Sequence, residues 1–159
     1  MFGRPPDVVA EHGMAKGIHL LDLKSGETTV LPGSDDMFAP KWTLDGRFVV
    51  AMPHKKWDRL MRFDFATQAW SELVPYDGAN PRLSPDGEWV YFESEHEGRH
   101  LSRVRMLDSR IERLVDYADV TRGTLMTCVG PAGVDLDGSP LLHCSANASE
   151  LHGLDLVLP

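Results

Sequence analysis

The sequence predicts an all-β protein assembled from a repeated unit of four short antiparallel strands. Three observations support this: an eleven-residue stretch recurs 41 residues later, apolar and polar residues alternate within each copy, and Asp-Gly pairs separate the alternating runs. Alternation with a period of two is typical of half-buried strands, and Asp-Gly supplies the positive φ that tight hairpins need. No window of eleven or more residues has convincing helical spacing, so we expect almost no helix.

The repeat consists of two blocks. Residues 40–50 align with residues 81–91, which brings the Asp-Gly turns at Asp45 and Asp86 into the same position. A second block recurs at offsets of 42 and 41, in residues 18–22, 60–64 and 101–105. A third Asp-Gly turn, at Asp137, follows the second by 51 residues. We therefore expect an insertion of about ten residues in the last unit, either within 120–127 or within 129–134.

The strands can be placed in chain order within each unit. Inner strands are predicted to end at Trp42, Leu83 and about Cys128. The second strands follow at 47–52, 88–93 and 139–144, and the third at 58–65, 100–107 and 150–156. Outer strands are expected at 69–74 and 111–116, and residues 17–23 and 27–31 supply the outer half of an earlier unit.

Four strands at a period of 41 residues indicate the blades of a β-propeller rather than a sandwich. We expect one domain over residues 1–159, with about three and a half antiparallel blades. The units are a partial blade at 1–35 and blades at 36–76, 77–117 and 118–159. Because a typical closed propeller has at least four blades, the ring is expected to be incomplete or barely closed. Open strand edges invite pairing, so we expect either self-association or an open fragment of low stability.

Charge and length argue against several classes of function. The chain has 24 acidic and 16 basic residues and a net charge of −8, whereas binding to nucleic acid needs clustered Lys and Arg. The longest apolar run, 48–52, is far shorter than a membrane-spanning helix. Residues 1–6 lack the apolar core of a signal peptide. We expect a cytoplasmic protein, or a periplasmic one if a longer parent chain carries a leader.

The two cysteines, Cys128 and Cys144, both fall in strand-like segments of the last unit. A disulfide between them is geometrically feasible. Disulfide frameworks are, however, much denser in secreted domains than in a chain of this composition. We therefore expect two reduced, buried thiols.

The segment from His96 to His100 is a literal HExxH motif, with Glu97 as its acidic residue. Zinc peptidases need this spacing on a helix, where both histidines share one face and the glutamate lies beside the metal-bound water. Here the motif contains Gly98 and lies between two predicted strands. We interpret it as a chance match in a solvated turn, and we expect no catalytic, cofactor-binding or metal-binding residues.

Three further patterns favour structural roles. The pair Asp135 and Asp137 resembles part of a calcium loop but lacks the remaining oxygen ligands. The basic and aromatic segment 54–57 is typical of a solvated hairpin tip. We expect three tryptophans to pack between blades: Trp42, Trp70 and Trp89. The alternative is that they stack on a ligand. No Gly-x-Ser-x-Gly nucleophile motif of the serine hydrolases occurs.

The turn Ser84-Pro85-Asp86-Gly87, its degenerate copy at 43–46 and the Ile-x-x-Leu-Asp-Leu strand at 18–23 resemble TolB-like and WD40-like propeller repeats. The blocks 20–34, 62–73 and 150–159 look like the C-terminal propeller of bacterial proteins that also carry a winged-helix domain or a Ser/Thr kinase domain. The last unit departs from the family pattern, because residues 134–137 are Val-Asp-Leu-Asp where Ser-Pro-Asp is usual.

The resemblance implies a non-catalytic interaction or sensing module, part of a larger signalling or regulatory protein, with protein partners and no cofactor. Acidic connections at Asp35-Asp36, at 93–95 and at Asp116 favour neutral or basic partners. The alternative is the accessory propeller of a prolyl-oligopeptidase-type hydrolase, whose catalytic domain would be encoded elsewhere.

Overall fold

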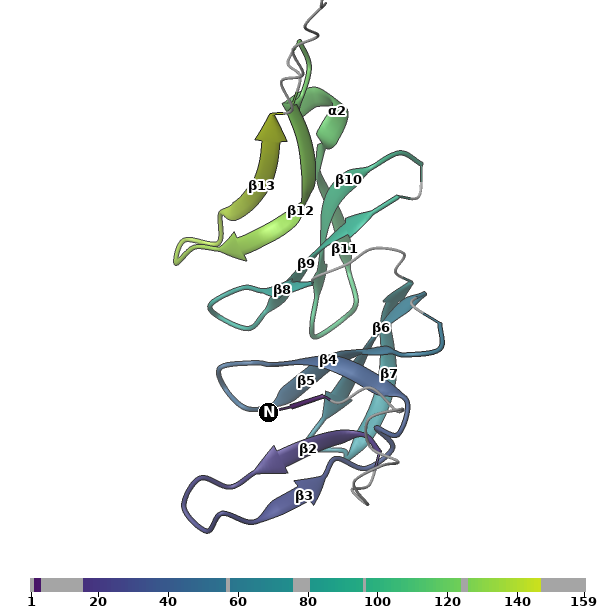
Figure 1. Cartoon of the computed structure of the whole chain (residues 1–159), viewed down its shortest axis with the longest axis vertical. Coiled ribbons are helices and arrows are strands. Elements are labelled where there is room, and N and C mark those ends of the chain that lie inside the picture. The colour runs from purple at the N-terminus through teal and green to yellow at the C-terminus, as the bar shows by residue number, and fades with distance from the viewer. Residues whose placement is uncertain are drawn as a thin grey trace, which may run out of the picture.

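The computed structural model of the chain describes residues 2–3, 16–56, 58–75, 81–95, 97–123 and 126–146. These residues form four antiparallel sheets. The sheets stack in a row from the N-terminal strands at one end to the C-terminal hairpin at the other (Figure 1). The predicted all-β, propeller-like architecture is confirmed. No helix among these residues is long and apolar enough to span a membrane.

Each sheet is a run of consecutive strands. The first sheet contains β1 (Phe2–Gly3), β2 (Ile18–Leu21) and β3 (Thr28–Val30). The second contains β4 (Met37–Trp42), β5 (Phe48–Pro53), β6 (Arg59–Asp64) and β7 (Ala69–Pro75). The third contains β8 (Arg82–Leu83), β9 (Trp89–Ser94), β10 (His100–Arg105) and β11 (Ile111–Asp116). The fourth contains β12 (Met126–Val134) and β13 (Pro140–Ala146).

Two features of the strand pattern were not predicted. β1 pairs with β2, with Phe2 opposite His19, although two residues are too few to show any alternation. The third inner strand was expected to end near Cys128, but β12 continues to Val134. Its register breaks on either side of Pro131, so bulges extend the strand. The predicted strand at 150–156 lies outside the described residues.

The last unit contains a short helix that mostly precedes the first predicted place of the insertion, 120–127, and bulges that lie within the second, 129–134. The four-residue helix α2 (Tyr117–Val120) and the turn after it follow β11 directly. The hydroxyl and the backbone N–H of Thr121 both donate to the carbonyl of Tyr117, which ends the helix. The bulges of β12 account for further residues, because each bulge adds an unpaired residue to one strand.

The second sheet is buried on both faces. Along β5, Phe48, Val50 and Met52 belong to the apolar cluster shared with the third sheet. The alternate residues Val49 and Ala51 belong to the cluster shared with the first sheet. Because side chains of a strand point to opposite faces in turn, an almost continuously apolar β5 is the pattern expected for a strand between two neighbouring sheets.

The third sheet also lies between two neighbours. Val90, Phe92 and Val104 pack in the cluster shared with the second sheet. On the other face, Leu101 packs with Tyr117 and Cys128 in a smaller cluster next to the fourth sheet. The third sheet therefore has a large apolar contact on one side and a small one on the other.

Candidate functional site

The first two Asp-Gly turns share one hydrogen-bonding arrangement. The Thr43 hydroxyl donates to Asp45 Oδ1 over 2.6 Å and accepts the Phe48 N–H at 3.0 Å. Ser84 does the same, donating to Asp86 and accepting the Trp89 N–H at 2.9 Å. Each carboxylate also accepts the N–H two residues later. A hydroxyl is needed at this position because only a hydroxyl both donates and accepts there.

The third turn lacks that hydroxyl, and its next strand explains why. Pro140 stands where Phe48 and Trp89 stand in the other turns, and proline has no N–H to donate. In the first two turns, the backbone N–H of the hydroxyl residue donates to the carbonyl five residues later. In the third turn, the Asp135 N–H donates instead to the carbonyl four residues later, that of Ser139, at 3.0 Å. The Asp135 carboxylate accepts the N–H groups of Asp137 and Ser139. The predicted plain turn is what these contacts form.

The turn carboxylates are stabilised in their charged form. The Thr43 hydroxyl and then the Arg47 N–H lower the pKa of Asp45 below its ordinary value. The Ser84 hydroxyl and then the Glu88 N–H lower the pKa of Asp86. For Asp137, contacts with Ser139 and then Asp135 lower the pKa. These carboxylates stabilise the turns and are therefore poorly suited to act as bases.

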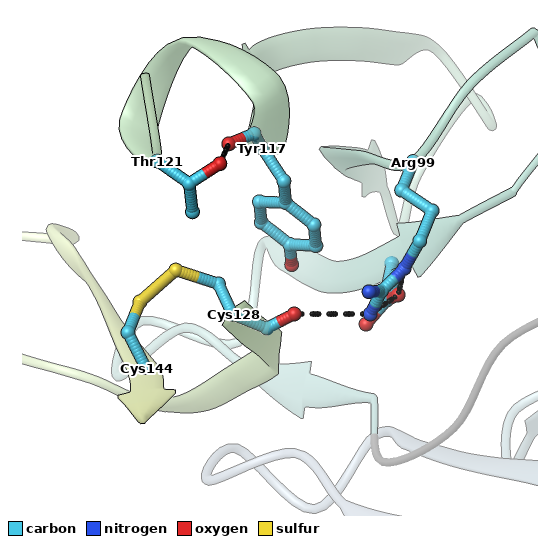
Figure 2. The surroundings of a disulfide bond; sticks show 6 residues. Arg99, Tyr117, Thr121, Cys128 and Cys144 are labelled. Atoms are coloured by element: carbon cyan, nitrogen blue, oxygen red, sulfur yellow. Dashed lines mark hydrogen bonds and ion pairs between the residues drawn. A yellow bond between two sulfur atoms is a disulfide. The ribbon is translucent and has the colours of Figure 1, made fainter. Parts of the chain in front are cut away.

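Cys128 and Cys144 form a disulfide between directly opposed residues of β12 and β13 (Figure 2). The prediction of two reduced thiols is therefore wrong. The sequence showed that a disulfide was feasible but not that Cys128 and Cys144 are directly opposed, which the register of β12 against β13 establishes. Cys128 is buried against Leu101 and Tyr117, so the disulfide belongs to the contact between the third and fourth sheets.

A buried tyrosine and an ion pair adjoin the disulfide (Figure 2). Arg99 bonds Glu93 through two nitrogens and also donates to the Cys128 carbonyl at 3.0 Å. Its guanidinium lies 5.5 Å from the ring centre of Tyr117. Burial, followed by the charge of Glu93, raises the pKa of Tyr117 to about 12. The Tyr117 hydroxyl forms no hydrogen bond within the described part of the chain, so it remains a neutral phenol at ordinary pH.

The described residues of the HExxH motif, 97–100, are not on a helix. His96 lies outside the described residues. Glu97 lies in the turn before β10, and His100 is the first residue of that strand. His100 Nδ1 lies 2.7 Å from the Gly98 carbonyl. Across the described ranges, no group of three or more His, Cys, Asp or Glu side chains could hold a metal ion.

A cavity of about 550 Å³ lies between the second and third sheets. Its wall combines apolar side chains with polar ones, and it is lined by Asp58, Val74, Pro75, Phe92, Ser94, Glu97, His100, Ser102, Ile111 and Arg113. His100 and Ser102 are two residues apart on β10 and therefore share a face. The Ser102 hydroxyl has no hydrogen-bond partner among the described groups, so it is not bonded to His100 as a serine nucleophile would be to its base.

Sequence reasoning missed Ser102 and considered His100 only within HExxH. A usable signal was present in the strand pattern. His100 and Ser102 occupy the same alternating face of β10 as the buried Val104. Buried polar side chains usually need hydrogen-bond partners. Polar residues on the buried face of a strand are therefore candidates for a binding site, and the alternation along β10 shows that His100 and Ser102 are such residues.

Some charged residues predicted to be available for partners are used within the fold. Glu93 is 7% exposed and is bonded by Arg99. Asp116 is bonded by Arg113. By contrast, Asp35 is exposed in the connection before β4. Acidic connections exist, but sequence alone could not separate solvated carboxylates from those that bind a neighbouring arginine.

The basic segment before β6 lines a second cavity, of about 350 Å³. Lys55 and Lys56 line it together with Asp36, Asp58 and Arg59. Both oxygens of Asp58 accept bonds from Arg59. The wall of this cavity therefore carries both acidic and basic groups. Trp57 lies outside the described residues.

The tryptophans have three different environments. Trp70 packs in the cluster between the first and second sheets and donates to the Pro32 carbonyl at 2.8 Å, as predicted. Trp42 is 41% exposed and stacks at 5.3 Å on Phe65, which packs against the same cluster. The guanidinium carbon of Arg103 lies over the Trp89 ring, 4.1 Å from the ring centre.

Solved structures with the same arrangement of strands are propellers. The chain aligns with TolB from Acinetobacter baumannii with a TM-score of 0.55 and 16% identity, over 80% of this chain and 34% of that one. It aligns with a prolyl endopeptidase with a TM-score of 0.57 and 15% identity, over 82% and 23% of the two chains. For the tricorn protease the TM-score is 0.54 with 17% identity, over 80% and 13%.

Among curated proteins, the chain is 29% identical over 105 residues to an uncharacterized protein of Agrobacterium fabrum. The aligned region covers 64% of this chain and 36% of that protein, so the chain spans about a third of its relative's length. No family model matches the sequence. The shared architecture with these solved structures gives the chain a β-propeller fold of the TolB type.

Proposed function

We propose that the chain is a non-catalytic interaction or sensing module within a larger signalling or regulatory protein. The observation that carries this proposal is the burial of the central strands on both faces. β5 and β9 contribute buried residues to both of their faces, so the hairpins that join the strands are presented from a fixed scaffold. Loops on such a scaffold vary without loss of the core and are well suited to recognition.

The charge of the module favours a neutral or basic protein partner. The chain carries a net charge of −8, and Asp35 is exposed in a connection between the first two sheets. Potentials of opposite sign speed association and select partners. Nucleic acid is disfavoured by the same charge.

A charge-reversal variant tests this function. Partners captured by the purified chain and identified by mass spectrometry are expected to be lost with Asp35→Lys, which alters a connection without touching the core. They are expected to be retained with Arg122→Met, an exposed change at the other end of the stack. Peptide hydrolysis that copurifies with the chain through repeated chromatography would contradict a non-catalytic role.

The second candidate is the accessory propeller of a peptidase, because two of the similar solved structures are proteases. The deciding observation is the coding sequence around this chain. A neighbouring Gly-x-Ser-x-Gly domain would favour the peptidase. A winged-helix or kinase domain would favour signalling.

The disulfide favours an oxidising compartment. Disulfides persist in the periplasm and outside the cell and are rare in the cytosol. We therefore favour the periplasmic alternative over the predicted cytoplasmic one. Alkylation of thiols in intact cells, followed by mass spectrometry, is expected to find Cys128 and Cys144 unmodified. Alkylated cysteines would support the cytoplasm.

Self-association through open strand edges remains part of the proposal. Light scattering of the purified chain is expected to give a mass above 17.7 kDa, the mass of one chain. A single monodisperse species of that mass would contradict it.

A further inference from the structure

The cavity between the second and third sheets has the size of a small-molecule site. Its volume of about 550 Å³ is within the range of roughly 300–1,000 Å³ that ligand pockets occupy. Val74 and Pro75 of β7 form one side, and Phe92 and Ile111 are apolar contributions from the third sheet. These side chains would contact the apolar body of a ligand.

Ser102 and His100 place unused hydrogen-bonding capacity inside this cavity. Ser102 is 1% exposed and its hydroxyl has no partner among the described residues. His100 is 8% exposed, and its Nδ1 lies 2.7 Å from the Gly98 carbonyl. Because a carbonyl only accepts, Nδ1 carries the proton in the neutral ring and Nε2 is left as an acceptor. A buried polar group without a partner is costly, so a ligand that bonds these groups gains affinity.

Around the cavity, some of the described charged groups are already paired within the protein, and one is free to bind a ligand. Both oxygens of Asp58 accept from Arg59, and Arg113 donates to Asp116 through two nitrogens. Glu97 is exposed, and no hydrogen bond or ion pair involves it in the described part of the chain. Among the described residues of the cavity wall, the uncompensated charge is therefore a carboxylate.

We propose that the cavity binds a small amine with an apolar, ring-sized body. The available groups are a carboxylate, an imidazole nitrogen that accepts and a hydroxyl that accepts or donates. They match the N–H donors and the positive charge of a protonated amine. An anionic ligand of the same shape would meet Glu97 without a compensating cation. The site goes beyond the interaction role, because it uses an inter-sheet cavity rather than the acidic connection at Asp35.

Phenethylamine is the probe for the first experiment. It is titrated into the ¹⁵N-labelled chain, alongside its neutral analogue 2-phenylethanol and its anionic analogue phenylacetate. Saturable shifts are expected at the amides of β10 and β7, with affinity for the amine at least tenfold above that for phenylacetate. Equal affinity for phenylacetate, or shifts confined to residues away from the cavity, would overturn the proposal.

Matched variants identify the groups responsible. Glu97→Gln is expected to weaken amine binding about tenfold and to leave 2-phenylethanol binding unchanged. Ser102→Ala is expected to weaken binding of the amine severalfold, and it removes only an unbonded hydroxyl, so the fold is retained. Glu95→Gln removes a charge from the same connection outside the cavity and is expected to bind like the unchanged chain. Equal losses in Glu95→Gln and Glu97→Gln would show a general charge effect and contradict the site. Failure here leaves partner capture through Asp35 untouched, so the two proposals fail separately.

Discussion

The two faces of the third sheet are held in different ways. Toward the second sheet, the contact is a broad apolar cluster contributed by both sheets. Toward the fourth sheet, the buried cluster of described residues is smaller and consists of Leu101, Tyr117 and Cys128, with Val115, Leu142 and Cys144 packed against it. There, three side chains of the third sheet and its loops donate to backbone carbonyls of the fourth. They are Arg82 to Ala132, Tyr91 to Gly138 and Arg99 to Cys128.

This difference shows how a small sheet is attached to a larger stack. The described part of the fourth sheet has two strands, and an isolated hairpin is marginally stable because it buries little apolar surface. Polar bonds to its carbonyls and one disulfide supplement that small contact. The Ala132 carbonyl lies at the bulge beside Pro131, where the ladder is irregular, and the Gly138 carbonyl lies in the turn between β12 and β13.

The largest expected effects come from matched truncations of the two apolar clusters. Leu60 and Leu101 are both 0% exposed, and they lie in the larger and smaller cluster respectively. Leu60→Ala is expected to lower the free energy of unfolding by about 4 kcal/mol and Leu101→Ala by about 3 kcal/mol, because the cost grows with the cavity left behind. Urea denaturation measures both. A larger loss for Leu101→Ala would contradict the comparison.

Loss of the disulfide is the next largest effect. Replacing both Cys128 and Cys144 with alanine is expected to cost about 3 kcal/mol, as the bond closes a short loop in the unfolded chain; the two residues are separated by 16 positions. Hydrogen exchange should accelerate in β12 and β13 while amides of β5 keep their protection. Reduction of the unchanged protein is the control and should match the double variant. Uniform acceleration across all sheets would show that the fourth sheet is not a separate unit.

Arg99 tests the polar attachment itself. Arg99→Met keeps much of the side-chain volume but leaves Glu93 buried without its partner and the Cys128 carbonyl without its donor. The expected loss is about 2 kcal/mol, and adding Glu93→Gln should restore part of it, as a double-mutant cycle would measure. Arg122→Met is the control, because its pair with Asp119 is exposed and should contribute little. Equal losses in the two arginine variants would contradict the attachment.

The repeat made the sheets predictable from the sequence. Features that do not repeat, such as β1 and the disulfide, could not be predicted. The Asp-Gly turns at Asp45 and Asp86 and the alternation along β6 and β10 identify strands because each repeats in the chain. β1 could not be predicted, since two residues carry no periodicity. Neither could the disulfide, because it depends on the register of β12 against β13, which bulges alter.

The cavity was beyond sequence reasoning for a related reason. It forms between sheets, from residues far apart in the chain, such as Val74 and Ser102. Only its polar side has a local signal, the placement of His100 and Ser102 at buried positions of one strand face. Whether a carboxylate such as Glu93 or Glu97 is solvated depends on where an arginine lies in space, and spacing in the sequence does not give this.

The hydroxyl groups of the Asp-Gly turns should contribute less to the free energy of unfolding than the inter-sheet contacts do. Ser84→Ala removes the donor to Asp86 and the acceptor of the Trp89 N–H at a buried position. The expected loss is about 1.5 kcal/mol. Ser25→Ala, which removes an exposed acceptor of the Glu27 N–H, is the matched control with little expected change. Thermal unfolding monitored by circular dichroism would compare them, and equal shifts would argue against a structural role for the turn hydroxyl.

The smallest expected effect is the contribution of the Asp86 charge to acid stability. The Ser84 hydroxyl, followed by the Glu88 N–H, lowers the pKa of Asp86 in the folded chain below its ordinary value of 3.8. The unfolded chain therefore takes up this proton first as the pH falls. The stabilisation is present above the ordinary pKa and is lost as the pH falls through the folded pKa. Asp86→Asn keeps an oxygen that accepts these bonds but cannot titrate. Its free energy of unfolding should therefore decline less between pH 5 and pH 3, a window of about two units around the ordinary pKa. Parallel declines for the two proteins in urea titrations at each pH would show that the turn does not favour the charged carboxylate.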